Sequence, residues 1–220
     1  MMWKKEDTDY TLYVVTDRNL MSSSSIEESV ELSILGGATL IQLREKKISS
    51  KDFLSLAWRV KKITDAYDVP LIINDRVDIA LAVGAAGIHI GQSDFPADIV
   101  RNMIGKETLL GVSATTLKEA ITAEKDGADY IGVGAMYVTS TKTDAKPVSM
   151  HTLQEICNAV SIPIVVIGGI CEENITDFAD TDIDGIAVVS AVISKDNVTE
   201  AAAKIKTAFI DIVQNGQDNV

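Results

Sequence analysis

The sequence predicts a single-domain α/β protein folded as a (β/α)8 barrel, also called a TIM barrel, and three observations support this class. Short runs rich in β-branched residues recur along all 220 residues. Helical periodicity or a capping residue follows each run. No linker divides the chain, so we expect one domain over residues 1–220, with residues 1–10 and about 214–220 as terminal extensions.

The expected strands are nearly all apolar, which is typical of parallel strands that helices cover. They span residues 11–16, 39–44, 70–74, 87–90, 109–112, 130–134, 163–168 and 185–189. Amphipathic helical segments include residues 50–67, 116–126 and 197–213. An open doubly wound sheet usually carries a glycine-rich fingerprint after its first strand, whereas this chain reads Thr16-Asp17-Arg18-Asn19 there. The closed barrel is therefore favoured.

Composition excludes several classes of partner. The net charge is −12, with 32 acidic and 20 basic side chains, so we expect neither nucleic acid nor an anionic membrane as a partner. No apolar run reaches the roughly 18 residues of a membrane span, and no signal peptide is expected. Two cysteines, Cys157 and Cys171, make no disulfide framework, which predicts a cytoplasmic protein with plain thiols. A homo-oligomer stays possible.

Polar side chains follow the second expected strand, at the barrel end where functional residues collect. The segment reads Gln42-Leu43-Arg44-Glu45-Lys46, and the period of two places Gln42, Arg44 and Lys46 on one face. Two cations that point into a barrel mouth are costly unless they meet an anion. This segment therefore predicts a phosphate ligand. The alternative is that Arg44 and Lys46 pair with Asp75 and Asp94, or extend into solvent.

Asp75 and Asp94 follow the third and fourth expected strands, which are neighbours, so their carboxylates should lie close together. Magnesium prefers oxygen ligands and often binds together with phosphate groups, so the pair predicts a Mg²⁺ site. The alternative for each aspartate is an N-cap of the helix that follows it.

A second phosphate site is expected after the seventh and eighth strands, where barrels commonly hold phosphate. Gly168-Gly169 and Ser190 stand there, and glycines let backbone N–H groups approach a ligand. The polar stretch that begins with Thr139-Ser140-Thr141-Lys142 is either a solvated loop or a closing lid. Neither histidine forms a cluster: His89 is expected in the core and His151 on the surface.

These segments together resemble the thiamine-phosphate synthase family, and the resemblance spans essentially the whole chain. The motifs that carry it are residues 42–46, Asn74-Asp75-Arg76, Gly87-Ile88-His89-Ile90-Gly91-Gln92, Asp94, Gly111-Val112-Ser113 and Thr139-Ser140-Thr141-Lys142.

The resemblance implies that hydroxymethylpyrimidine diphosphate and hydroxyethylthiazole phosphate are joined to form thiamine phosphate and pyrophosphate. It assigns residues to four roles. The pyrimidine diphosphate site would be Gln42, Leu43, Arg44, Glu45, Lys46, Asn74, Ser113 and Lys142. The thiazole phosphate site would be Thr139, Ser140, Thr141, Gly169, Val189 and Ser190. Asp75 and Asp94 would bind Mg²⁺, and Arg44, Lys46, Lys142 and Ser113 would be the catalytic residues.

In the family's proposed mechanism, the aminopyrimidine expels pyrophosphate and the thiazole nitrogen captures the resulting carbocation. Such a route needs leaving-group stabilisation and positioning rather than a nucleophile. One departure from the family pattern is the run Gly134-Ala135-Met136-Tyr137-Val138, where relatives often have prolines. Three alternatives stay open: a thiazole tautomerase-like barrel, another phosphate-binding barrel isomerase, and a non-catalytic phosphate-ligand-binding barrel.

Overall fold

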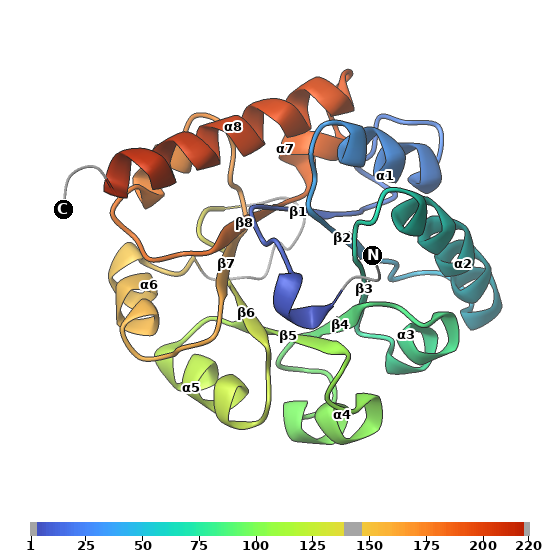
Figure 1. Cartoon of the computed structure of the whole chain (residues 1–220), viewed down its shortest axis with the longest axis horizontal. Coiled ribbons are helices and arrows are strands. Elements are labelled where there is room, and N and C mark those ends of the chain that lie inside the picture. Colours follow the sequence, from blue (N-terminus) through green and yellow to red (C-terminus); the bar gives the residue numbers. More distant parts are fainter. Residues whose placement is uncertain (1–3, 139–146, 218–220) are drawn as a thin grey trace.

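Eight parallel strands form a closed barrel in the order in which they occur along the chain. The computed structural model describes residues 4–138 and 147–217. Helices ring the barrel on its outside (Figure 1). The predicted single-domain (β/α)8 barrel is confirmed.

The observed strands agree with the expected ones to within two residues at each end. They are β1 (Leu12–Val15), β2 (Leu40–Leu43), β3 (Leu71–Asn74), β4 (Gly87–Ile90), β5 (Leu109–Ala114), β6 (Tyr130–Val133), β7 (Ile164–Ile167) and β8 (Gly185–Val188). The register closes at Tyr13, which is aligned with Leu40 of β2 and with Ala187 of β8.

Each strand leads into a helical connection. The α-helices are α1 (Ile26–Leu35), α2 (Ser50–Ala66), α3 (Val77–Val83), α4 (Ala97–Ile104), α5 (Leu117–Lys125), α6 (Met150–Cys157), α7 (Ser190–Ile193) and α8 (Val198–Gln217), and the 3-10 helices are η1 (Lys5–Asp7) and η2 (Ile175–Phe178). The side chains of Ser49, Thr116 and Ser149 accept backbone N–H bonds at the starts of α2, α5 and α6. Short hydroxyl side chains satisfy free N–H groups at helix starts in this way. Helix α8 continues into the range expected as a terminal extension.

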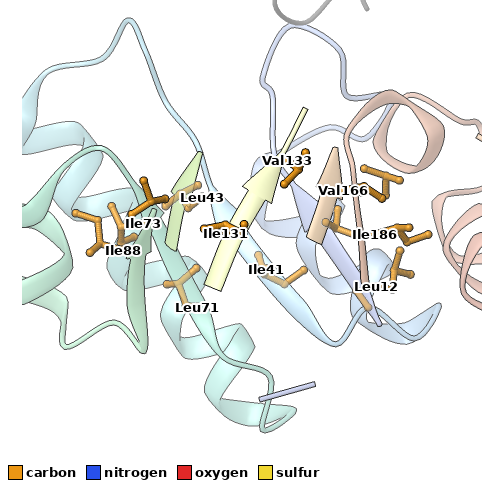
Figure 2. Close-up of a cluster of buried hydrophobic side chains, with 14 of the residues drawn as sticks. Leu12, Ile41, Leu43, Leu71, Ile73, Ile88, Ile131, Val133, Val166 and Ile186 are labelled. Atoms are coloured by element: carbon orange, nitrogen blue, oxygen red, sulfur yellow. The ribbon is translucent and has the colours of Figure 1, made fainter. Parts of the chain in front are cut away.

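Side chains alternate between two apolar layers. Outward-facing residues such as Ile41, Leu43 and Ile131 pack between the strands and the helices (Figure 2). Inward-facing residues such as Leu40 and Tyr13 fill the barrel interior. Each strand is short and buried on both faces, so it reads as a continuous apolar run in the sequence.

Arg101 of α4 connects several segments at the N-terminal end of the barrel. Its guanidinium donates to the carbonyl oxygens of Gly105, Thr108 and Gly127, at 2.6, 2.8 and 3.0 Å, and pairs with Asp129. Asp129 also accepts the Lys5 ammonium from η1, which lies across this end (Figure 1). This cluster connects the segments that precede β5 and β6 with the N-terminal segment.

Within residues 4–138 and 147–217, no helix combines the length and the apolar character that crossing a membrane requires. The cytoplasmic location and the homo-oligomer stay predictions.

Candidate active site

A cavity of about 480 Å³ opens at the C-terminal ends of the strands. This is within the usual size range of small-molecule sites, roughly 300–1,000 Å³. Its walls bring together most of the predicted residues from separate parts of the chain: Gln42, Arg44, Lys46, Asn74, Asp75, Asp94, Ser113, Gly169, Val189 and Ser190.

Arg44 follows β2 and enters the cavity wall already paired with a carboxylate. Its Nη1 donates to Oδ2 of Asp17 at 2.8 Å, and its backbone N–H donates to the Thr16 hydroxyl at 3.0 Å. Both partners follow β1, the neighbouring strand. The sequence did not single out Asp17; its position directly after a strand was the available signal.

Lys46 forms an ion pair with Asp75. This agrees in part with the alternative from the sequence, in which Arg44 and Lys46 pair with Asp75 and Asp94. Asp75 has a left-handed backbone with φ of 61°, a conformation that Asp tolerates better than most residues. Its N–H donates to the carbonyl of His89 on β4 at 2.9 Å. The strand-end geometry thus turns the Asp75 carboxylate toward the cavity.

Asp94 lies beside Asp75 and accepts the Gly91 N–H on Oδ2 at 2.8 Å. Burial, and to a lesser degree the negative charge of Asp75, raises the pKa of the Asp94 carboxyl, against the lowering effect of the Gly91 N–H. Neither aspartate caps a helix, because the cap positions of α3 and α4 are Arg76 and Pro96 and lack side-chain cap bonds. The capping alternative is therefore wrong.

The two carboxylates suit a hard cation that takes oxygen ligands. Among the residues that the structure describes, no group of three or more His, Cys, Asp or Glu side chains gathers as a metal site. A magnesium ion held by this pair would therefore take its other ligands from phosphate oxygens and water, as Mg²⁺ commonly does.

Asn74 places a buried amide at the cavity. Its side chain is buried, and its Nδ2 has no hydrogen-bond partner within the described ranges. Because buried donors are nearly always paired, this amide is suited to an acceptor that enters the cavity. It neighbours Asp75, so the acceptor would lie next to the paired carboxylates.

The opposite wall is built from backbone. Gly168 and Gly169 after β7 have φ of 102° and 68°, and Ser190 begins the short helix α7 after Val189. A Cβ atom on Gly169 would come within 2.8 Å of the Tyr137 Cβ. Glycine at this position therefore lets the chain at Tyr137 and Val138 pack directly against the Gly169 backbone.

Several predicted residues lie elsewhere. The Leu43 side chain packs in the outer apolar layer, so only its backbone is near the site. Glu45 pairs with Arg18 at 2.9 Å instead of lining the cavity. Thr139, Ser140, Thr141 and Lys142 lie outside the described residues.

The cavity floor holds polar residues that sequence reasoning did not assign to the site: Tyr13, His89 and Tyr130. His89 was expected in the core, and it is buried there with hydrogen bonds to Tyr130 and Ser113. In the sequence pattern of a strand, an inward-facing tyrosine cannot be distinguished from an ordinary apolar core residue. The one feature that could have indicated a role in the site was its large size for a barrel interior.

Comparison with known proteins gives consistent results. A family model described as thiamine monophosphate synthase matches residues 12–192. A thiamine-phosphate synthase from Clostridium botulinum is 60% identical over 205 residues, with 93% of this chain and 96% of the relative covered. One from Clostridium beijerinckii is 59% identical over 208 residues, covering 94% and 100%.

Solved structures agree with the sequence relatives. Thiamine phosphate pyrophosphorylase from Pyrococcus furiosus superposes with a TM-score of 0.86 at 36% identity, covering 94% of this chain and 98% of that one. (S)-3-O-geranylgeranylglyceryl phosphate synthase from Thermoplasma acidophilum has a TM-score of 0.68 at 16% identity, over 92% and 94%. The second likeness shows the fold alone.

A closed barrel with a polar cavity at its C-terminal end defines a (β/α)8-barrel enzyme. Within that class, the chain belongs to the thiamine monophosphate synthase family. The resemblance that the strand-end motifs indicated is confirmed.

Proposed function

We propose that this chain joins 4-amino-2-methyl-5-hydroxymethylpyrimidine diphosphate to 4-methyl-5-(2-hydroxyethyl)thiazole phosphate, forming thiamine phosphate and pyrophosphate. The observation that carries the proposal is the convergence of Arg44, Lys46, Asn74 and the Asp75–Asp94 pair on one cavity, in a chain of this family. Two cations, an amide nitrogen without a partner among the described residues, and a carboxylate pair are groups that suit a metal-bound diphosphate.

The two phosphorylated ends would occupy opposite walls. The diphosphate would lie against Arg44, Lys46 and Asn74, with Gln42 and Ser113 toward the pyrimidine ring. The thiazole phosphate would meet the backbone of Gly169 and the start of α7 at Ser190, because the first N–H groups of a helix lack intrahelical partners. Leu43 and Val189 would contribute backbone groups, and Glu45 would act through Arg18, with which it forms an ion pair.

The reaction breaks the bond between the pyrimidine methylene carbon and the diphosphate oxygen, and the thiazole nitrogen forms the new C–N bond with its lone pair. The departing pyrophosphate keeps the electron pair of the broken bond. Arg44 and Lys46 stabilise that growing negative charge, and the cavity walls hold the thiazole nitrogen near the carbon. No proton has to leave a carbon, which is consistent with a site that needs no strong base.

Magnesium fits the donor set that Asp75 and Asp94 provide, and when bound it would neutralise charge on the diphosphate. Lys46 already contacts Asp75, so the ion pair places a protein cation beside the same oxygen atoms. Lys142 is proposed to add charge from the loop that follows β6.

The test combines purified protein with both substrates and Mg²⁺ and measures thiamine phosphate and pyrophosphate. Asp75→Ala should abolish turnover while far-UV circular dichroism stays unchanged. Asp78→Ala is the matched control, because Asp78 lies three residues away and pairs with Arg76 at the surface. Absence of product with the unaltered chain would refute the synthase proposal. Change in the thiazole phosphate alone, without the pyrimidine substrate, would support the tautomerase alternative.

A further inference from the structure

A continuous hydrogen-bonded chain runs through the barrel interior beneath the cavity. Gln42 Nε2 donates to the Tyr13 hydroxyl at 2.7 Å, and the Tyr13 and Tyr130 hydroxyls are 2.9 Å apart. Tyr130 contacts His89 Nδ1 at 3.1 Å, and His89 Nε2 contacts the Ser113 hydroxyl at 2.9 Å. The chain therefore joins β2, β1, β6, β4 and β5. All five residues line the cavity, and the middle three form its floor.

The interior is shaped to hold this chain. A Cβ atom on Gly111 would overlap the Tyr130 ring and His89 Nδ1, and one on Gly132 would come within 3.0 Å of His89 Cε1. Two strand glycines thus leave space for two large polar side chains where barrels usually place branched apolar ones. The Tyr130 ring also packs against Tyr10 and Tyr13, with centroids 5.1 and 6.0 Å apart.

The direction of the protons along the chain follows from its first link. The Gln42 amide nitrogen can only donate, so the Tyr13 oxygen accepts from it and has its own proton left for Tyr130. Tyr130 then donates to His89 Nδ1, which leaves the imidazole proton on Nε2. Burial raises the pKa of both Tyr13 and Tyr130, so each phenol keeps its proton.

The opposite direction leaves a buried donor unsatisfied. If His89 Nδ1 carried the proton, Tyr130 would donate to Tyr13. With the Gln42 amide nitrogen facing Tyr13, the Tyr13 proton would then have no acceptor, because the partners of its hydroxyl within the described ranges are Gln42 Nε2 and the Tyr130 hydroxyl. Buried hydroxyl donors without partners are unfavourable. The first direction satisfies every link.

We propose that Tyr13, Tyr130 and His89 are positioning residues. They fix Ser113 as a hydrogen-bond donor and orient the side-chain amide oxygen of Gln42 as an acceptor in the cavity. Ser113 accepts from His89 Nε2, so its own proton points to the ligand. The ligand group at Ser113 is therefore an acceptor, such as a ring nitrogen or a phosphate oxygen, and the group at Gln42 is a donor, such as an amino group. This inference rests on the proposed function for the identity of the ligand.

The tautomer of His89 tests the chain without any substrate. Long-range ¹H–¹⁵N NMR of the ligand-free protein distinguishes imidazoles protonated on Nε2 from those protonated on Nδ1. His151 is the second of two histidines, and His151→Asn removes its signals. We expect the Nε2-protonated form in the unaltered chain, and in Tyr130→Phe a change in the ¹⁵N shift of the unprotonated Nδ1, which loses its hydrogen bond from Tyr130. An Nδ1-protonated His89 in the unaltered chain would overturn the proposal.

Kinetics test whether the chain acts through Ser113. Tyr130→Phe should lower kcat/KM for the pyrimidine diphosphate about tenfold, the effect of losing one buried hydrogen bond, and leave KM for the thiazole phosphate unchanged. Tyr13→Phe should act in the same direction. Tyr10→Phe is the matched control, because Tyr10 stacks on Tyr130 but contributes no link to the chain. Equal effects of Tyr10→Phe and Tyr130→Phe would refute a positioning role.

A double-mutant cycle completes the test. In a Ser113→Ala background, Tyr130→Phe should lower kcat/KM by less than it does in the unaltered chain, because one of the two residues through which it acts is gone. Additive effects would overturn the proposal. If the unaltered chain makes no thiamine phosphate, the proposed function fails, while the NMR result still decides the direction of the chain.

Discussion

Arg44 of the cavity wall is held by Asp17, with 2.8 Å between Nη1 and Oδ2. The two side chains come from the ends of neighbouring strands, and both are largely shielded from solvent, at 22% and 13% exposed. A guanidinium fixed by a carboxylate presents its remaining N–H groups in a defined direction. The pair therefore orients the cation as well as neutralising it.

Replacing Asp17 with alanine should lower kcat/KM for the pyrimidine diphosphate by about tenfold, because a poorly oriented Arg44 loses one of its contacts to the leaving group, roughly 1–1.5 kcal/mol. Steady-state kinetics measure this effect. The surface pair between Arg76 and Asp78 provides the control, and Asp78→Ala should stay within about twofold of the unaltered chain. An unchanged kcat/KM in Asp17→Ala would show that Arg44 is oriented by other contacts.

Asp94→Asn should raise the melting temperature of the ligand-free protein at neutral pH and remove its magnesium-dependent activity. The folded-state pKa of Asp94 is raised, so ionisation of this group disfavours the fold. This loss of stability is absent at low pH and is fully present above the raised pKa. Asparagine keeps an oxygen for the Gly91 N–H and removes the charge.

Thermal melts between pH 4 and pH 8 test that sign. The stabilisation in Asp94→Asn should be largest at the upper end of the range, about pH 8, and vanish toward acid. Asp180→Asn, at an exposed position, should not change the melting temperature. A lower melting temperature in Asp94→Asn at neutral pH would contradict the expected destabilising effect of the Asp94 charge.

Gly169→Ala should raise KM for the thiazole phosphate by about tenfold, since a Cβ there meets Tyr137 and displaces the Gly169 backbone that the phosphate would contact. Gly84 is a close control, because its φ of 62° is also left-handed and a Cβ there meets nothing within 4 Å. Gly84→Ala should cost roughly 1 kcal/mol of unfolding free energy from backbone strain. It should leave both KM values unchanged. Similar KM values in the two variants would remove Gly169 from the phosphate site.

Arg101→Ala should reduce the free energy of unfolding by about 3 kcal/mol, because it leaves Asp129 without its guanidinium partner and removes bonds to three carbonyls. Urea denaturation measures this loss. Below the unfolding transition, kcat should stay near that of the unaltered chain, since these contacts lie at the end of the barrel away from the cavity. A lower kcat without a loss of stability would contradict this separation.

The fold could be predicted almost completely from the sequence, because parallel strands covered by helices leave a pattern of short apolar runs. The positions of the strand-end cations and carboxylates could be predicted from the order of the strands. Once β2, β3 and β4 are placed side by side, Arg44, Asp75 and Asp94 must lie at the same end of the barrel. The alternation along β2 also separated inward Gln42 from outward Leu43.

The partners of these residues could not be predicted in the same way. Asp17 follows β1 and pairs with Arg44, which follows the neighbouring strand β2. The sequence contains several other acidic residues that could have been the partner of Arg44. The Tyr13–Tyr130 link joins positions 117 residues apart, and its geometry depends on the barrel diameter and on glycines of other strands. Such contacts are set by three-dimensional closure rather than by local pattern.

The Arg101 cluster has a consequence for how this protein can change over generations. Its bonds connect carbonyls at the N-terminal ends of the strands, whereas the cavity residues follow the C-terminal ends. Loops around the cavity can therefore accept insertions or substitutions while the Arg101 contacts at the other end continue to stabilise the barrel. Mutations that change substrate specificity at the cavity can therefore accumulate without loss of the contacts that stabilise the fold.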